Sequence, residues 1–223
     1  MSSLITSFAD TESKEIQWLW NPYIALEKLT LAYGTKETDL TDFMLRFTAA
    51  LSTGGTGEPP CSILYFDSEM NAGWIKSKLQ AYKADLTTIS CLLDTGLAAL
   101  LKAKDEISRA HIRGIIINGL ERLLFTKKAM KASEINAGMQ QLAALAKETQ
   151  CAILLGSEDI HPDGSAISRY QVEPIRRLPR SILRIERRDS AFIVTQEKNN
   201  IAEIGQPFMM DDQGTITFVD HTR

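Results

Sequence analysis

Short apolar runs without interspersed polar residues constrain the fold of this chain more than any other feature of its sequence. The clearest is Ile115-Ile116-Ile117, at the centre of the segment 112–118. Such an unbroken run is typical of a parallel strand that helices cover on both faces. We expect four strands of this kind, at 29–33, 62–67, 112–118 and 151–156. Amphipathic patterns between them predict helices that begin shortly after Thr41 and that cover about 72–82, 95–107 and 133–149, the last with Ser133 as its N-cap.

The C-terminal part of the chain changes from this alternation to consecutive strands. Ser181–Ile185 and Phe192–Gln196 are predicted as a pair, and 207–219 has the turn residues of a hairpin around Asp211–Gly214. The whole pattern predicts an α/β fold with a mostly parallel central sheet flanked by helices, and with antiparallel strands added toward the C-terminus. A chain of 223 residues suits one such domain. We expect it over 15–223, after a flexible N-terminal arm over 1–14.

The charge and the scattered cysteines exclude several classes of function. A net charge of -3 argues against holding nucleic acid by general basicity, because phosphate neutralisation needs a concentrated positive surface. The polar N-terminus and the strand-sized apolar runs favour a cytoplasmic protein without membrane contact. Cys61, Cys91 and Cys151 fit no metal or redox spacing, so no metal site is expected.

The segment between the first strand and the first helix can be aligned with a phosphate-binding loop of the form GxxxxGK[ST]. Such a loop cradles phosphate oxygens with backbone N–H groups and the N-terminus of the following helix, while its lysine reaches the terminal phosphates. Here Asp39 replaces the second glycine and Leu40 replaces the lysine. An ordinary strand-to-helix turn would also explain the segment on its own. The candidate loop comprises Gly34, Thr35, Lys36, Glu37, Thr38, Asp39, Leu40 and Thr41.

The residues around this loop resemble those of a known family. The segments 18–34, 49–54, 63–69 and 78–86 follow the order and spacing of RepA-like ATPases, RecA-superfamily proteins that are common on plasmids and prophages. Segments near 165–169, 179–183 and 197–200 resemble the same family, so the resemblance covers about residues 16–219. It implies a RecA-like P-loop domain.

The resemblance also assigns roles to single residues. Glu69 matches the glutamate that orients the attacking water, whereas Asn118 stands where the family has an aspartate that supports magnesium. Where the family has a polar sensor after the fourth strand, this chain has the stretch Ser157-Glu158-Asp159. Arg180 and Lys198 match groups that reach the nucleotide of a neighbouring subunit in related hexameric ATPases.

The changed loop positions should weaken nucleotide binding. Loss of the lysine removes a charge-assisted hydrogen bond worth about 1.5–3 kcal/mol, and a carboxylate at Asp39 adds repulsion of about 1–4 kcal/mol near phosphate. Asp39 also lacks the freedom of glycine at positive φ. Lys36 is an alternative source of the missing charge, although Glu37 beside it would compete for that charge. We therefore expect a degenerate domain without ATP hydrolysis and without a cofactor, in which Glu69 and Asn118 are vestiges.

Three functions are compatible with these features. The first is a binding, scaffold or regulatory protein linked to mobile-element DNA replication, with a protein partner or with self-association into a homo-oligomer. The second is an active ATPase or ring helicase motor with a divergent loop, which would need ATP and Mg²⁺. The third is nucleotide-independent DNA binding, for which the candidate contacts are Arg176, Arg177, Arg180 and Lys198. The arginine-rich segment 176–188 would equally form a solvated rim that Glu173, Glu186 and Asp189 compensate.

Overall fold

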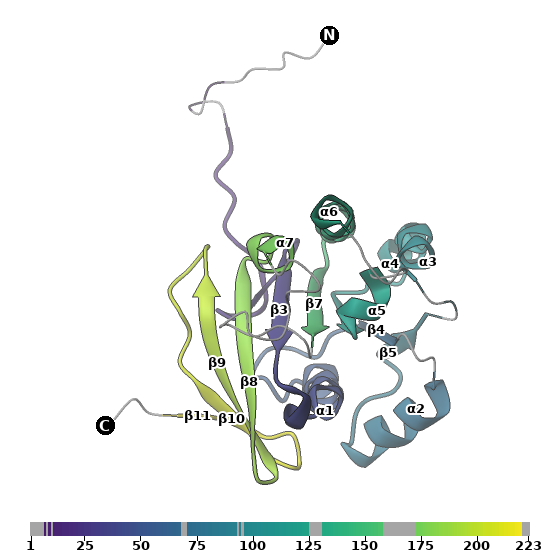
Figure 1. The fold of residues 1–223 in the computed structure, drawn as a ribbon, viewed down its shortest axis with the longest axis vertical. Helices are drawn as coiled ribbons and strands as arrows, with labels where there is room; N and C mark the ends of the chain where they lie inside the picture. Colours follow the sequence, from purple (N-terminus) through teal and green to yellow (C-terminus); the bar gives the residue numbers. More distant parts are fainter. Residues whose placement is uncertain are drawn as a thin grey trace.

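A nine-stranded sheet with helices on both faces organises the described part of the chain (Figure 1). The computed structural model describes residues 7, 9, 11–67, 71–92, 94, 96–124, 131–157 and 173–219. Within these residues the strand order is β11-β10-β9-β8-β3-β7-β6-β4-β5. A separate two-stranded ribbon precedes the sheet and pairs β1 (Trp18–Trp20) with β2 (Ile24–Ala25).

Parallel strands form the centre of the sheet. β3 (Leu29–Tyr33) lies between β7 (Ala152–Ser157) and β8 (Ser181–Arg188), and it pairs with both in parallel. On the β7 side follow, also in parallel, β6 (Gly114–Asn118), β4 (Ile63–Asp67) and β5 (Ile89–Cys91). Because parallel neighbours cannot be joined by a tight turn, the chain crosses over between them, and the crossover helices cover the sheet.

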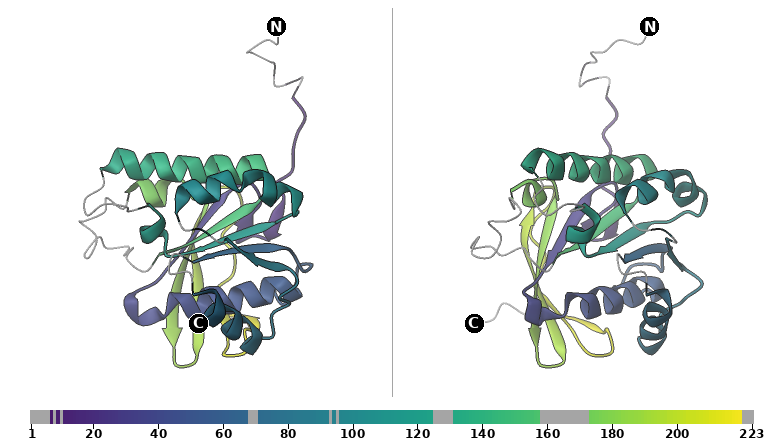
Figure 2. Two further views of the ribbon diagram at one scale, coloured as in Figure 1. Left: turned by 90° about the vertical axis from the view of Figure 1, so that its right-hand side faces the viewer. Right: turned by 45° about the vertical axis from the view of Figure 1, so that its right-hand side comes forward.

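The two faces of the sheet belong to two separate cores. Ile115 and Ile117 are buried against α6 (Ala132–Thr149), whereas Ile116 is buried against α1 (Leu40–Thr53). Alternate residues of the strand therefore face different helix layers, which explains the unbroken apolar run. α2 (Ala72–Ala81) lies on the α1 face (Figure 2). The α6 face carries α3 (Leu97–Lys102), α4 (Lys104–Arg109), α5 (Leu120–Leu124) and α7 (Glu173–Arg177).

Antiparallel strands complete the sheet toward the C-terminus. β9 (Ala191–Asn199) pairs with β8, and β10 (Phe208–Met210) and β11 (Ile216–Phe218) follow outward. The predicted turn at the last hairpin is present, since Asp211 Oδ1 accepts hydrogen bonds from the backbone N–H groups of Gln213 and Thr215. The architecture confirms the predicted fold class and is consistent with a RecA-like domain.

Element boundaries differ from the predictions at a few places. The helix expected over 95–107 is two helices, α3 and α4, separated at Ala103, and the ribbon of β1 and β2 was not expected. Helix α6 begins at Ala132, because the Glu134 carboxylate accepts a hydrogen bond from the Lys131 N–H group; Ser133 therefore lies inside the first turn and is not the N-cap. None of the helices in the described residues is long and apolar enough to span a membrane.

One buried cation joins α1 to the C-terminal strands. Arg46 is only 6% exposed, and its Nη1 donates to the carbonyl oxygens of Ser190, at 3.1 Å, and Asp211, at 2.7 Å. Its Nη2 lies 2.6 Å from Asp42 Oδ2, one helical turn away. The guanidinium also packs over the rings of Tyr82 and Phe192. Arg46 therefore holds together segments that are distant in the sequence.

Replacement of Arg46 by methionine should destabilise the protein. The change keeps an apolar stem but leaves Asp42 Oδ2 and two carbonyl groups without the Arg46 donor, although the Tyr82 hydroxyl still bonds to Asp42 Oδ1. Breaking a buried pair in this way costs about 3–5 kcal/mol of unfolding free energy. Urea denaturation followed by circular dichroism measures this loss. The matched control is Arg109→Met at the exposed end of α4, for which we expect a change within about 0.5 kcal/mol. Equal losses in the two variants would contradict the role of Arg46.

Candidate functional site

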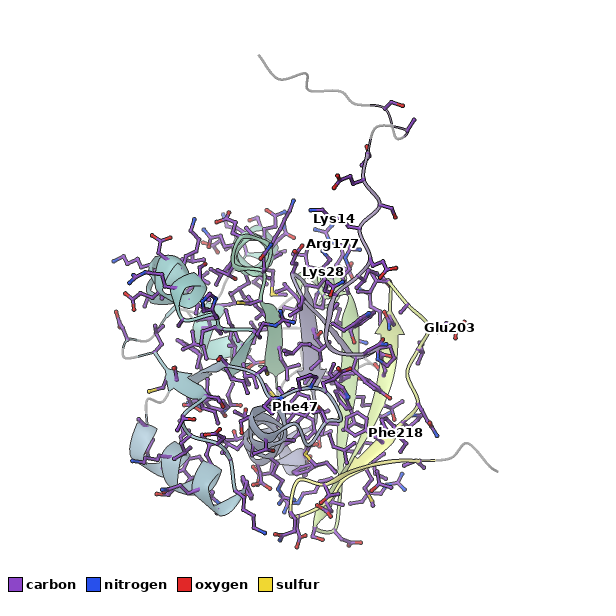
Figure 3. All side chains as sticks on the ribbon, turned by 180° about the vertical axis from the view of Figure 1, so that it is seen from behind. Lys14, Lys28, Phe47, Arg177, Glu203 and Phe218 are labelled. Carbon is purple, nitrogen blue, oxygen red and sulfur yellow. The ribbon has the colours of Figure 1, made fainter. Side chains whose placement is uncertain are left out.

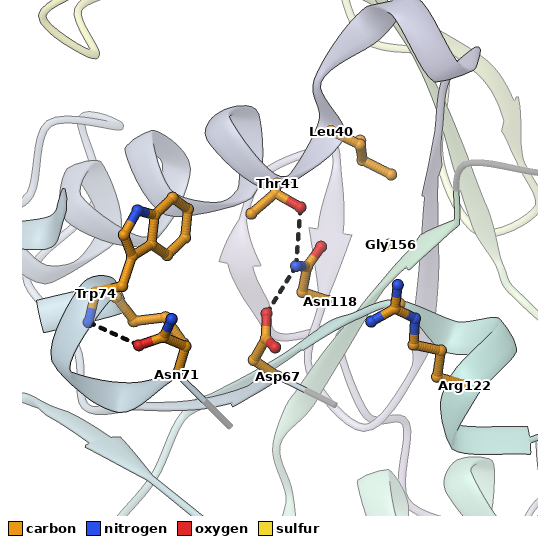
Figure 4. A pocket seen from close by; sticks show the side chains of 10 residues that line it. Leu40, Thr41, Asp67, Asn71, Trp74, Asn118, Arg122 and Gly156 are labelled. Carbon is orange, nitrogen blue, oxygen red and sulfur yellow. Dashed lines mark hydrogen bonds between the residues drawn. The ribbon is translucent and has the colours of Figure 1, made fainter. Parts of the chain in front are cut away.

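The candidate site lies where the parallel strands end. Asp67 is the last residue of β4, Asn118 is the last residue of β6, and the two are paired in register. The start of α1 approaches the same edge, because α1 follows β3 after a short loop. A cavity of about 360 Å³ opens between these elements (Figure 4). It is lined by Leu40, Thr41, Asp67, Asn71, Trp74, Ile75, Asn118, Gly119, Arg122 and Gly156.

Hydrogen bonds join three of the side chains that line this cavity. Asn118 Nδ2 donates to Thr41 Oγ1 at 3.1 Å and to Asp67 Oδ2 at 2.9 Å (Figure 4). The hydroxyl at the last position of the aligned loop therefore meets the residue that the resemblance matches to the magnesium-supporting aspartate. Because that residue is an amide, it links the two neighbours by donating to both, whereas a carboxylate could only accept. An uncharged side chain therefore joins Thr41 and Asp67.

The loop between β3 and α1 is closed by bonds within the protein. Residues Lys36–Thr38 form a 3₁₀ helix, η2, in which the Thr38 N–H group bonds to the Thr35 carbonyl oxygen. Thr38 is buried, and its hydroxyl bonds to the carbonyl oxygen of Ile185 in β8. A side chain at Gly34 would lie only 2.7 Å from Thr38, so only glycine fits there. The loop is folded back against β8 and uses the Thr38 amide for its own turn.

Asp39, which aligns with the second glycine of the loop motif, has a left-handed backbone conformation. Its φ of 54° and ψ of 59° are left-handed, a region in which aspartate is tolerated better than most residues. Asp39 therefore adopts this conformation although it lacks the backbone freedom that glycine has at positive φ. The Asp39 carboxylate accepts from the Asp42 N–H group at 3.3 Å and lies 3.1 Å from Arg187 Nη1. Asp39 thus caps α1 with an anion of the protein itself, at the end where a phosphate would bind.

Leu40 occupies the lysine position as a core residue. It is 1% exposed and packs with Met44 against β7 at Gly156, where an added Cβ would lie 3.1 Å from Met44 Cε and 3.6 Å from Leu40 Cδ2. The cavity wall is therefore apolar where the motif would supply an ammonium group. The side chain of Lys36 lies outside the described residues, as does all of Glu69.

Two further side chains, which the sequence analysis did not single out, border the cavity. Arg122 of α5 extends toward the side of the cavity where Asn118 and Gly156 lie (Figure 4). Trp74 lies at the start of α2, where its backbone N–H group donates to Asn71 Oδ1 at 3.2 Å, and the residue is 44% exposed. The signal that could have found Arg122 is its position just after the strand that ends at Asn118.

The predicted trans-acting residues lie away from the loop. The Arg180 N–H group bonds to the carbonyl oxygen of Leu29, the first residue of β3, whereas the loop follows the last residue of that strand. Lys198 Nζ donates to the carbonyl oxygens of Arg176 and Arg177, at 2.9 and 3.2 Å, and so caps the end of α7. Burial lowers the pKa of Lys198, and Arg180 and Arg176 lower it further.

The arginine-rich segment is mostly paired within the protein. Arg176 lies 3.1 Å from Glu197 Oε2 and over the ring of Tyr33. Arg184 and Arg188 both pair with Glu186, which was expected as a compensating residue. Arg177 bonds to Asn136 on α6, and in Figure 3 it lies well apart from Phe47, which marks α1. Only Arg187 reaches the loop, a contact that the sequence analysis missed because Asp39 and Arg187 are 148 positions apart.

Comparison with known proteins places this geometry in a family. A family model described as an AAA domain matches residues 1–157, which include β3, the loop, β4, β6 and β7. No curated protein matches the chain. The matched region is more than half of the chain and contains the edge on which the cavity lies. The protein therefore belongs to the AAA domain family, and its fold is that of a P-loop NTPase-like domain.

Proposed function

We propose that this protein is a P-loop domain that binds partners and does not hydrolyse ATP. One observation carries the proposal: Asp39 caps α1 and pairs with Arg187, so the protein's own carboxylate takes the place of a bound phosphate. A nucleotide would have to displace this carboxylate from the helix N-terminus. It would also lack the lysine, since Leu40 is buried in the core.

The metal position supports the same proposal. Phosphoryl transfer depends on cations that neutralise the developing charge on the phosphate oxygens. At the end of β6 the side chain is an amide, and it is already engaged with Thr41 and Asp67. Among the described residues, no group of three or more His, Cys, Asp or Glu side chains lies together in a way that could hold a metal ion. Through this bridge, the Asp67 carboxylate is linked to the Thr41 hydroxyl.

The resemblance to RepA-like ATPases supports a scaffold or regulatory role linked to mobile-element DNA replication, in the cytoplasm. We favour a protein partner or self-association into a homo-oligomer over DNA, because Arg176, Arg187 and Lys198 are all engaged within the chain. Arg177 also bonds within the chain, to Asn136. Arg180 is exposed just before the first residue of β8, a position from which it could contact a second subunit.

Calorimetry with ATP and Mg²⁺ tests the loop. We expect no binding to the natural protein tighter than about millimolar. The double variant Asp39→Gly with Leu40→Lys should bind ATP at least about ten-fold more tightly, because it removes the competing anion and restores a charge-assisted hydrogen bond. The matched control, Asp39→Gly with Leu40→Met, opens the same loop without adding a cation and should remain weak. Micromolar binding by the natural protein would instead support the active ATPase.

The substitution Asn118→Asp tests the bridge. It places a second carboxylate beside Asp67, and repulsion of about 1–4 kcal/mol between the two should lower the Tm by several degrees. Millimolar Mg²⁺ should restore the Tm of this variant and leave that of the natural protein unchanged, as differential scanning fluorimetry can measure. The control Asn118→Ala loses the same hydrogen bonds without adding charge, so its Tm should not respond to Mg²⁺. A Tm increase of the natural protein with Mg²⁺ would contradict the proposal that the uncharged Asn118 side chain replaces a metal ligand.

A further inference from the structure

The outermost C-terminal strand, β11, leaves one edge of the sheet open. It pairs with β10, and within the described residues no strand lies on its other side. An open edge is a template for another strand, and proteins usually protect it with charged side chains, prolines or bulges. The segment 215–219 has no charge and no proline, and β11 pairs with β10 in unbroken register. This edge therefore lacks those protections.

Two residues of β11 direct their backbone groups away from the sheet. The Val219 N–H group donates to the carbonyl oxygen of Pro207, the residue just before β10, so Val219 points its N–H group toward β10. Because the direction of the backbone groups alternates along an antiparallel strand, those of Ile216 and Phe218 point outward. Two N–H groups and two carbonyl groups are thus directed toward the position that a further strand would take.

Exposed apolar side chains gather on the segment that forms this edge. Six large hydrophobic residues are exposed in the described part of the chain, and four of them come from 204–219, namely Ile204, Met209, Phe218 and Val219. Phe218 is 49% exposed although its ring stacks on that of Tyr23. Phe218 and Val219 are successive residues, so their side chains lie on opposite faces of the sheet. A partner strand would therefore bury apolar surface on both faces.

A second copy of this chain has the chemistry that the edge requires. When two copies of β11 pair antiparallel about a two-fold axis beside Thr217, Ile216 of each copy lies opposite Phe218 of the other. All four outward groups of each copy then have partners. The resulting pair of a β-branched and an aromatic side chain is one that favours strand pairing. Since the segment 215–219 is uncharged, the two copies meet no like charge across the axis.

We propose that this protein forms a symmetric dimer in which the β11 strands of two copies pair and join their sheets. The proposal rests on the proposed self-association and gives it a surface. That surface is separate from Arg180, which precedes β8, because β9 and β10 lie between β8 and β11. Thr217 is exposed, and at the axis its side chain lies beside its own copy.

Opposite charges at position 217 test the pairing. Sedimentation velocity of the natural protein should show a species of twice the monomer mass that grows with concentration. Thr217→Lys and Thr217→Glu each place two like charges at the axis and should weaken the dimer at least about five-fold. An equimolar mixture of the two variants should restore it, because lysine then faces glutamate. The matched control, Thr195→Glu, adds a charge at an exposed position of β9 and should dimerise as the natural protein does.

Each contrary outcome has a distinct meaning. A natural protein that stays monomeric would overturn the proposal and leave a different protein as the partner. Dimers that persist in both Thr217 variants would also overturn it. If Arg180→Ala dissociates such a persistent dimer, the self-association stands but uses the surface around Arg180. Restoration by the mixture shows that both variants are folded, and none of these outcomes depends on whether ATP binds.

Discussion

The parallel alignment of β3, β7, β6 and β4 brings their carboxyl ends to one edge of the sheet, and every contact of the candidate site depends on it. Asp67 and Asn118 end neighbouring strands in register, so their side chains meet although 51 positions separate them. The helix that follows β3 brings Thr41 to the same place. A one-residue shift of β6 against β4 would turn the Asn118 side chain to the opposite face of the sheet and break this chain of hydrogen bonds.

The same alignment explains why the fold does not depend on a charged side chain at the start of α1. The sheet is stabilised by apolar side chains that face two helix layers, and none of that packing requires a lysine at position 40. Leucine there is buried against β7 and adds to the core. Asp39 likewise preserves the left-handed turn, while its carboxylate caps α1. Aspartate at position 39 and leucine at position 40 are therefore compatible with the fold.

Much of the architecture could be predicted because its signals are local. The unbroken apolar runs identified β3, β4, β6 and β7, and the turn residues near Asp211 identified the last hairpin. The ribbon of β1 and β2 was missed, because β2 spans only two residues and its pairing is set by contacts with the aromatic core around Trp20 and Phe208. The partner of Arg176 was missed for a related reason, since Glu197 comes from β9 and not from the arginine-rich segment itself.

The sequence by itself determined the alternation of strands and helices in the parallel part of the sheet, the fold class, and which side chains stand in the loop and at the ends of the strands. These follow from residue type and spacing, which act over a few positions. Only the tertiary structure decided that Arg187 meets Asp39 and that Asn118 bridges Asp67 and Thr41. Such contacts depend on which strands become neighbours, and strand order is fixed by the packing of the whole sheet.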